Sequence, residues 1–186
     1  DGKLAGENTD GKGFLKSLKD GNVATEGKNA VILGAGGAAR AIAVELAGAG
    51  MRNIMVINRN RDHAQLLVDI INKKTLATGS FMPWDGCVQI PEDTDILVNA
   101  TSIGFLDDAK PDIQYKKLPK DLVVCDVIPN KLRTSFLQEA ERHNLRTFNG
   151  LEMLVNQGAL AYELWTGRKA PVEVMKQAMK KEYGEC

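Results

Sequence analysis

Short hydrophobic runs alternate along the chain with longer segments in which apolar residues recur every three or four positions. Runs that are apolar throughout and rich in β-branched residues are typical of strands buried on both faces of a parallel sheet. They predict strands at residues 30–33, 53–57, 79–82, 96–98, 122–125 and 146–148. The pattern indicates an α/β fold in which βαβ units build a doubly wound parallel sheet of about six strands.

Helical periodicity fills most of the remaining chain. It predicts helices at residues 11–20, 38–49, 62–73, 134–143, 151–165 and 171–183. Gly50 ends the second of these helices, and a polar corner that can cap a helix precedes the third. The segment 106–121 contains two prolines and several charges, so we expect a surface loop with one turn of helix.

Composition excludes several classes of protein. The 186 residues include 24 basic and 24 acidic side chains, so no net field attracts nucleic acid or an anionic membrane, and any bound anion must be held locally. No apolar stretch approaches the ~20 residues that cross a bilayer, and no signal peptide is evident, which favours a cytoplasmic location. The three cysteines lack the spacing of a zinc site or disulfide framework, so no metal is expected, and Cys87 and Cys125 are predicted to be reduced packing residues.

The sequence GAGGAARA follows the first predicted strand and opens the second helix. In this GxGxxA arrangement Gly34 permits a tight turn, Gly36 lets the backbone approach a pyrophosphate, and Ala39 permits close packing of helix on strand. The helix N-terminus supplies amide donors, so residues 34–38 (Gly34, Ala35, Gly36, Gly37 and Ala38) are predicted to bind a dinucleotide. The alternative is a glycine turn that only joins strand to helix.

The end of the second predicted strand indicates which dinucleotide is bound. An NAD site usually places Asp or Glu there to accept a hydrogen bond from the ribose 2′-hydroxyl. This chain has Asn58, Arg59, Asn60 and Arg61 instead. Because a guanidinium can pair with the 2′-phosphate and stack on adenine, NADP is preferred to NAD. A solvated basic loop without a ligand is the alternative.

Three further segments carry polar residues with weaker signals. The sequence NATSIG, which includes Thr101, follows a predicted strand at the edge of the sheet where ligands bind, but such residues also form ordinary turns. An Asx-type turn that caps a helix is sufficient to explain Asp10. Gln157 could simply neighbour the apolar stripe formed by Met153, Leu154, Leu160 and Leu164.

The order of these motifs resembles the shikimate dehydrogenase family, including its quinate/shikimate relatives, over essentially the whole chain. The motifs are GxNTDGxGF at residues 6–14, GAGGAARA, the Asn-Arg pair, NATSxG, DVIPN…T at 126–134 and NGLEMLVNQGALAYELWTG at 149–167. The resemblance implies a Rossmann-type domain that binds NADP(H). It also implies interconversion of 3-dehydroshikimate and shikimate, a step of aromatic amino-acid biosynthesis.

The resemblance assigns roles to individual residues. Asp10 matches the catalytic aspartate, which contacts substrate and pairs with a lysine of an upstream domain, and Gln157 matches a glutamine that binds substrate hydroxyls. Val127, Gly150 and Met153 match positions beside the cofactor. A carboxylate keeps a neighbouring lysine charged and oriented to protonate an alkoxide. Because the lysine has no counterpart here, this chain alone is expected to bind dinucleotide but to turn over little substrate.

The chain departs from the family pattern at three positions. Pro129 replaces a tyrosine that contacts substrate, which puts the identity of the substrate in doubt. Asn60 replaces a threonine and His63 replaces a basic residue, and both changes weaken the preference for NADP over NAD. Two alternatives therefore stay open. One is a quinate/shikimate dehydrogenase paralogue with another cyclic polyol substrate, and the other is a non-catalytic dinucleotide-binding module.

The resemblance also predicts how the chain is divided. Residues 1–28 are expected to be a linker segment and helix belonging to the substrate domain, residues 29–150 the NADP-binding domain, and residues 151–186 helices that pack toward the substrate domain. That N-terminal substrate domain is expected to be absent from this sequence. The apolar stripe on residues 151–165 also suggests a second hypothesis, in which two copies pair as a homodimer.

Overall fold

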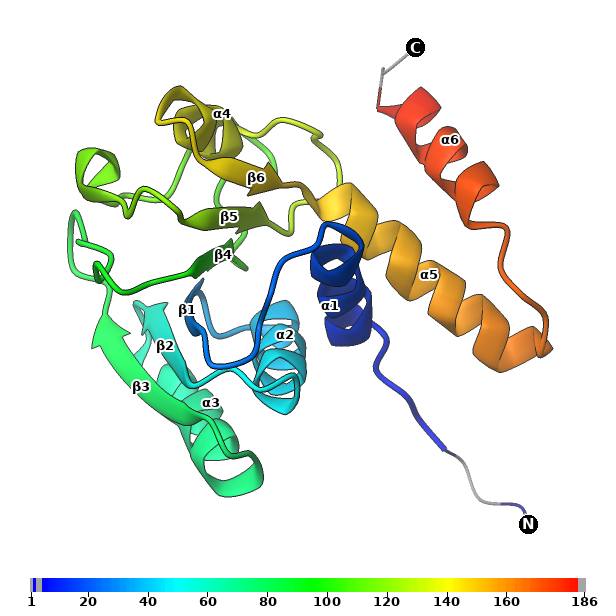
Figure 1. Ribbon diagram of the computed structural model, residues 1–186, viewed down its shortest axis with the longest axis horizontal. Coiled ribbons are helices and arrows are strands. Elements are labelled where there is room, and N and C mark those ends of the chain that lie inside the picture. Colours follow the sequence, from blue (N-terminus) through cyan, green and yellow to red (C-terminus); the bar gives the residue numbers. More distant parts are fainter. Residues whose placement is uncertain (1, 3–4, 184–186) are drawn as a thin grey trace.

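The computed structural model describes residue 2 and residues 5–183. A six-stranded parallel sheet forms its centre, in the order β3-β2-β1-β4-β5-β6 (Figure 1). The strands are β1 (Asn29–Leu33), β2 (Asn53–Asn58), β3 (Thr78–Pro83), β4 (Ile96–Asn99), β5 (Val123–Asp126) and β6 (Arg146–Phe148). This order is that of the Rossmann fold, so the predicted fold class and number of strands are confirmed.

The predicted helices are also present. They are α1 (Asp10–Asp20), α2 (Gly37–Gly48), α3 (Arg61–Lys74), α4 (Ser135–Arg142), α5 (Gly150–Thr166) and α6 (Val172–Glu182). The segment predicted to be a loop contains one short 3-10 helix, η1 (Tyr115–Lys117), as expected. β5 begins one residue later than predicted and ends on Asp126, a charged residue that the hydrophobic pattern left out of the strand.

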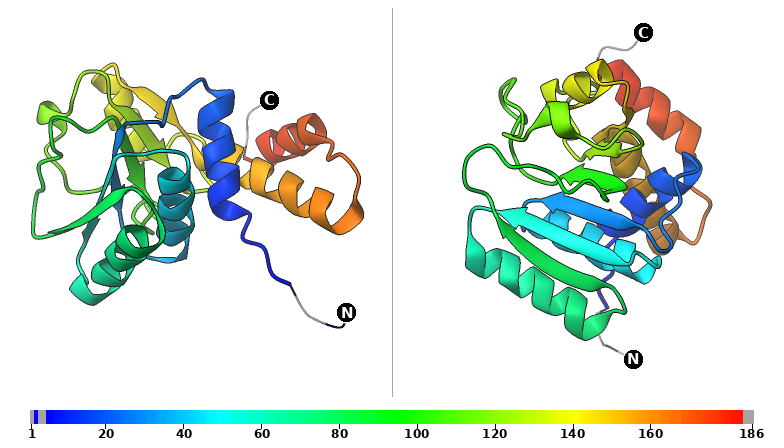
Figure 2. Two further views of the ribbon diagram at one scale, coloured as in Figure 1. Left: turned by 60° about the horizontal axis from the view of Figure 1, so that its bottom comes forward. Right: turned by 60° about the vertical axis from the view of Figure 1, so that its left-hand side comes forward.

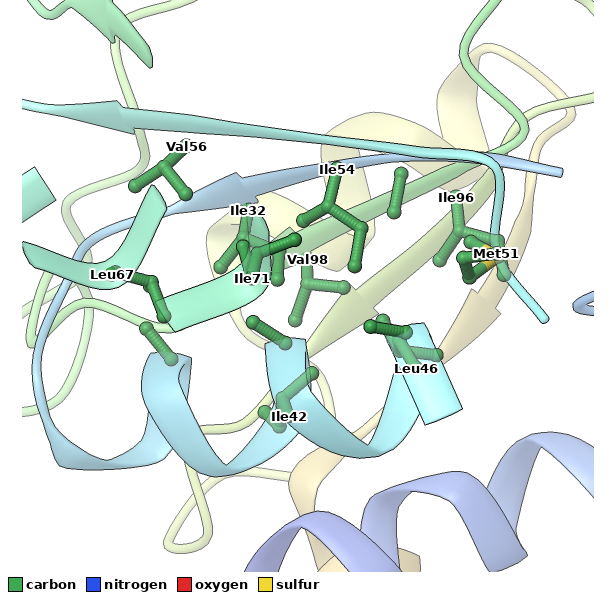
Figure 3. Close-up of a cluster of buried hydrophobic side chains, with 14 of the residues drawn as sticks. Ile32, Ile42, Leu46, Met51, Ile54, Val56, Leu67, Ile71, Ile96 and Val98 are labelled. Carbon is green, nitrogen blue, oxygen red and sulfur yellow. The ribbon is translucent and has the colours of Figure 1, made fainter. Parts of the chain in front are cut away.

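Successive strand residues face opposite sides of the sheet, which gives the molecule two cores. Ile32, Ile54 and Val98 belong to the first core, which α2 and α3 cover (Figure 3). Leu33 and Leu97 belong to the second core, where α4 supplies Phe136, Leu137 and Ala140. Because both faces of the sheet are covered, the central strands β1, β4 and β5 are apolar over most of their length, which is why the sequence shows continuous runs there rather than alternation. The edge strands β3 and β6 are less buried and contain polar residues.

The connection from β3 to β4 contains no helix. Val88 and Ile90, from this irregular segment, are buried in the second core, and Val88 forms an isolated parallel bridge with Ile113. This segment also contains Cys87, which is exposed, so the prediction that it is a packing residue is wrong. Burial alternates along this segment, with Val88 and Ile90 buried and Cys87 and Gln89 exposed, so Cys87 falls on the solvent side. Cys125 lies in β5 and is buried, as predicted.

Two glycines allow α1 to pack closely between α2 and α5 (Figure 1). A Cβ atom on Gly11 would lie 2.2 Å from the carbonyl oxygen of Ala41 in α2. A Cβ atom on Gly13 would lie 2.7 Å from the backbone nitrogen of Gln157 in α5. The glycines of the NTDGKG segment therefore have a packing role, and this packing fixes the start of α1 beside α5.

The helices α5 and α6 project from the body of the sheet (Figure 2). Met153, in the first half of α5, is buried, whereas Leu164 is 60% exposed and Trp165 is 85% exposed. The four residues expected to form one apolar stripe therefore lie in different environments, and this stripe does not describe a single face. Among the described residues, no helix is long and apolar enough to span a membrane.

Because α1 packs closely on α5, we expect replacement by Ala to change the stability differently at Gly13 and at Gly48. Gly13→Ala is expected to lower the free energy of unfolding by about 1–3 kcal/mol, because backbone atoms of Gln157 and Met153 must move. Gly48→Ala is the matched control, since its Cβ would meet open space, and its stability should be unchanged or slightly higher. Urea denaturation of both variants measures this. Equal stabilities would contradict the packing role of Gly13.

Candidate functional site

A tight turn connects β1 to α2 at the centre of the sheet edge. The amide of Gly34 donates to the carbonyl of Ile57 over 2.8 Å, and the φ of Gly34 is +104°. A Cβ atom here would lie 2.8 Å from the carbonyl oxygen of Ala100, which follows β4. Both the left-handed backbone and the close approach require glycine. The turn is thereby held against the loop after β4.

The next two glycines have a different environment. Gly36 has a φ of −78°, which any residue can adopt, and a Cβ atom on Gly36 or Gly37 would meet nothing within 4 Å. Neither backbone strain nor packing against the described residues therefore explains these glycines. Gly36 is the N-cap of α2, and no side chain caps the helix. The exposed amides and the positive end of the helix suit a phosphate group.

A cavity of about 500 Å³ opens at this turn. Of the predicted cofactor residues, those that line it are Gly34, Ala35, Gly36, Asn58, Arg59 and Thr101. The cavity therefore lies where the β1-α2 turn, the end of β2 and the loop after β4 meet. It is the topological switch point of the sheet, because β1 pairs with β2 on one side and β4 on the other.

Basic residues follow β2 on the wall of this cavity. Arg59 is exposed and makes no hydrogen bond or ion pair with any residue that the structure describes. Its neighbours hold the local backbone, since Asn58 Nδ2 donates to the Asn60 carbonyl over 2.7 Å and Asn60 Oδ1 accepts from the amide of His63. Asn60 thus caps α3. The exposed side chain of Arg61 begins α3, outside the lining of the cavity.

A buried network shapes the loop after β4. Asn99 is fully buried, and its Oδ1 accepts from the Thr101 hydroxyl over 2.7 Å. Its Nδ2 donates to Asp126 Oδ1 over 3.1 Å, and Asp126 Oδ2 accepts from the Thr134 hydroxyl over 2.6 Å. The network joins the ends of β4 and β5 to the start of α4. Asn99 therefore organises the loop, whereas Thr101 lines the cavity.

Asp126 has the most perturbed carboxyl in this region. Burial raises the pKa of Asp126 from 3.8 to about 6, although hydrogen bonds from Thr134, the Ile128 amide and Asn99 favour its charged form. Asp126 opens the DVIPN motif, but the sequence alone assigned it no role. Its place directly after an apolar run is the signal that could have identified it, because a strand end in a parallel sheet is buried.

Three other predicted cofactor residues lie near the end of β5 and the start of α5: Val127 directly follows β5, and Gly150 and Met153 belong to the first turns of α5. The amide of Val127 donates to the Asn99 carbonyl over 3.1 Å, and a Cβ atom on Gly150 would lie 2.4 Å from the Ile128 carbonyl oxygen. Glycine is needed for this close approach. Met153 is buried one turn later in α5. None of these three predicted residues lines the cavity, and neither do Gly37 and Ala38.

Asp10 and Gln157 lie at the contact between α1 and α5. The Thr9 hydroxyl donates to Gln157 Oε1 over 3.4 Å, and Asp10 follows as the first residue of α1. Both Asp10 and Gln157 are half-buried. The Asp10 carboxylate makes no hydrogen bond or ion pair within the described part of the chain. The fold therefore brings these two predicted residues to one place, with the carboxylate open to a partner.

Two family models match the chain. The one described as Shikimate / quinate 5-dehydrogenase matches residues 17–106, and the one described as Shikimate 5'-dehydrogenase C-terminal domain matches residues 150–180. Together they cover more than half of the sequence.

Individual proteins are similar over nearly the whole chain. "Shikimate dehydrogenase (NADP(+))" of Desulforamulus reducens is 42% identical over 99% of this chain, which spans 65% of that relative's length. The 5-ketofructose reductase of Gluconobacter sp. strain CHM43 has a TM-score of 0.93 and 50% identity. The match covers 97% of this chain and 65% of the reductase chain. Shikimate 5-dehydrogenase of Thermus thermophilus, solved with NADP(H) and shikimate, has a TM-score of 0.78 and 34% identity. The match covers 94% of this chain and 62% of the Thermus chain.

The buried carboxyl of Asp126 predicts a pH-dependent stability. Because its folded pKa lies above its ordinary value, the folded chain holds this proton more tightly, and the contribution to stability is lost as pH rises. From about pH 4 to about pH 7, the free energy of unfolding should fall by up to about 3 kcal/mol more than in Asp126→Asn. Urea denaturation across this range measures it, with Asp121→Asn, at an exposed position, as control. If the free energy of unfolding changed with pH to the same extent in the unmodified chain and in Asp126→Asn, burial would not be raising the pKa of Asp126.

Proposed function

Because this chain belongs to the shikimate dehydrogenase family, we propose that it is the cofactor-binding part of an NADP-dependent oxidoreductase that interconverts a hydroxyl and a ketone on a polyhydroxylated substrate. The observation that carries this proposal is the cavity at the switch point, where open glycines and an unpaired arginine meet. In its reduced form a nicotinamide dinucleotide supplies a hydride to the carbonyl carbon of the ketone, and in its oxidised form it accepts a hydride from the alcohol.

The residues of the cavity fit the two phosphate sites of NADP. The amides at the start of α2 would hold the pyrophosphate, since Gly36 and Gly37 leave the space of a side chain free. Arg59 would pair with the 2′-phosphate, because its guanidinium has no partner among the described residues. Residues 58–61 include neither Asp nor Glu, which supports NADP over NAD.

The contact between α1 and α5 would hold the substrate. Asp10 offers a carboxylate without a partner among the described residues, and Gln157 beside it can both donate hydrogen bonds to substrate hydroxyls and accept them. Hydride addition to a ketone leaves an alkoxide that needs a proton. In the family pattern an ammonium group supplies that proton, and the role of Asp10 is to orient that group and keep it charged.

We propose that the lysine belongs to a substrate domain outside this sequence. In this proposal residues 1–28 link the two domains, residues 29–150 bind NADP, and residues 151–186 pack toward the substrate domain. The chain spans 65% of the length of the Desulforamulus reducens relative, which leaves room for a further domain in such proteins. The exposed Leu164 and Trp165 on α5 provide an apolar surface for this contact.

The first candidate substrate pair is 3-dehydroshikimate and shikimate. The family models and the name of the Desulforamulus reducens relative support it. Asp10 and Gln157, which match the substrate-binding residues of the family, are both retained. A carboxylate and an amide at the same helix contact would suit the ring hydroxyls of this substrate.

A second candidate is 5-ketofructose, and two observations favour it. The 5-ketofructose reductase of Gluconobacter is 50% identical to this chain. Pro129 also stands where the family pattern has a tyrosine, so a phenol that would contact shikimate is lost. Reduction of this sugar ketone would need the same cofactor cavity and the same proton donor, with a different set of hydroxyl contacts.

The experiment that separates the two candidates compares 3-dehydroshikimate with 5-ketofructose as substrates of the whole protein, with NADPH oxidation as the signal. A much higher kcat/KM for 3-dehydroshikimate supports the first candidate, and the reverse preference supports the second. Binding of NADP+ with no turnover of either ketone would favour a non-catalytic dinucleotide-binding module.

Removal of the Arg59 guanidinium should change cofactor preference. Arg59→Ala is expected to weaken NADP+ binding by about tenfold or more, since a charge-assisted contact to phosphate is lost, and to leave NAD+ binding nearly unchanged. Calorimetric titration of both dinucleotides measures this. Arg168→Ala, at an exposed position after α5, is the control. Equal weakening for NADP+ and NAD+ would show that Arg59 does not recognise the 2′-phosphate.

The purified chain alone should bind NADP+ but oxidise shikimate at a rate close to background. The reason is that Asp10 would have no lysine to orient, so proton transfer would lack its donor. Saturable calorimetric binding and the absence of NADPH formation, measured on the same preparation, test this. Oxidation of shikimate by the purified chain at a measurable rate would refute the proposed role of an outside lysine.

A further inference from the structure

The strand β3 places an aromatic residue on the wall of the cavity. β2 and β3 run side by side, and their last paired residues are Asn58 and Pro83 (Figure 1). Trp84 follows at once, with its amide donating to the Asn58 carbonyl over 3.1 Å. Arg59 and Trp84 are therefore the next residues along two adjacent strands. Both line the cavity that contains the Gly34 turn.

The indole of Trp84 has no polar or aromatic partner among the described residues. Its side chain is half-buried and packs partly against the second core. Within the part of the chain that the structure describes, its indole N–H donates no hydrogen bond and its ring forms no aromatic or cation–π pair. A tryptophan at a cavity wall whose indole N–H has no hydrogen-bond partner among the described residues is suited to bind a flat, partly polar ligand.

Arg59 provides a second planar group next to it. The guanidinium is exposed and has no partner among the described residues, so it is free to turn toward a ligand. A guanidinium pairs with a phosphate group, and an indole stacks on the face of a purine base. The pyrophosphate would lie at the amides of Gly36 and Gly37, and the adenosine end of the cofactor would then extend toward the ends of β2 and β3.

We propose that Trp84 is the stacking residue for the adenine ring of the cofactor, on the side of the cavity formed by β3. This inference rests on the proposed function, because it needs an adenine dinucleotide in the cavity. It adds a determinant of binding that the sequence motifs do not contain. Affinity then depends on two adjacent residues with separate tasks, since Arg59 recognises the 2′-phosphate and Trp84 recognises the base.

The chain has two tryptophans, so fluorescence can isolate Trp84. The other, Trp165, is 85% exposed near the end of α5, which lies on the far side of the molecule from β3 (Figure 2). In Trp165→Phe, titration with adenosine 2′,5′-bisphosphate should quench the Trp84 emission in a saturable manner. This probe has no nicotinamide, so energy transfer to that ring cannot cause the signal. In Trp84→Phe the same titration should leave the Trp165 emission unchanged.

Calorimetry on replacements of Trp84 gives the second measurement. Trp84→Ala should raise the Kd for NADP+ and for the bisphosphate by about tenfold or more, and Trp84→Phe, which keeps an aromatic ring, by roughly threefold or less. Should Trp84→Ala fail to fold, the fluorescence of Trp165→Phe still decides the proposal, because Trp84 is intact there.

The results distinguish this inference from the function on which it rests. Unquenched Trp84 emission at calorimetric saturation, or the same affinity in Trp84→Ala as in the unmodified chain, would overturn the stacking role while NADP binding stands. No binding of NADP+ to the unmodified chain would overturn the proposed function and the stacking role together.

Discussion

The site depends on the close approach of the Gly34 turn to the backbone at Ala100. With 2.8 Å between a Cβ position on Gly34 and the carbonyl oxygen of Ala100, no larger residue fits, and the φ of +104° also requires glycine. This contact joins the first βαβ unit to the loop after β4. The cavity, the start of α2 and the loop containing Thr101 take their relative positions from it.

Buried polar groups hold the other side of the site. Asn99, Asp126 and Thr134 form one connected set of hydrogen bonds at the ends of β4 and β5. A buried polar group left without partners is destabilising, so the set must form as a unit. Val127 and Gly150 follow and lead into α5, where the close packing of α1 brings Asp10 to Gln157. The predicted residues are thus positioned by two kinds of contact, namely close backbone approaches at glycines and this buried side-chain network.

The fold could be predicted from the sequence because its hydrophobic pattern, its turn residues and its helix caps all indicated the same elements. Continuous apolar runs, glycine turns and capping residues all indicated the same parallel sheet, and the structure has each of the predicted strands and helices. Other features depend on tertiary contacts and could not be read in this way. The exposure of Cys87 and Leu164, the buried Asp126 and the packing roles of Gly11 and Gly13 all require knowledge of what lies opposite each residue. No motif includes Trp84, and only the register of β2 and β3 places it beside Arg59.

A crystal structure of this chain grown with saturating NADP+ tests the central claim most directly. We expect the pyrophosphate to lie against the amides of Gly36 and Gly37, with the 2′-phosphate at the Arg59 guanidinium. The Gly34 turn should keep its contact with Ala100. Density for NADP+ elsewhere on the molecule, or a cavity that stays free of dinucleotide under these conditions, would contradict this expectation.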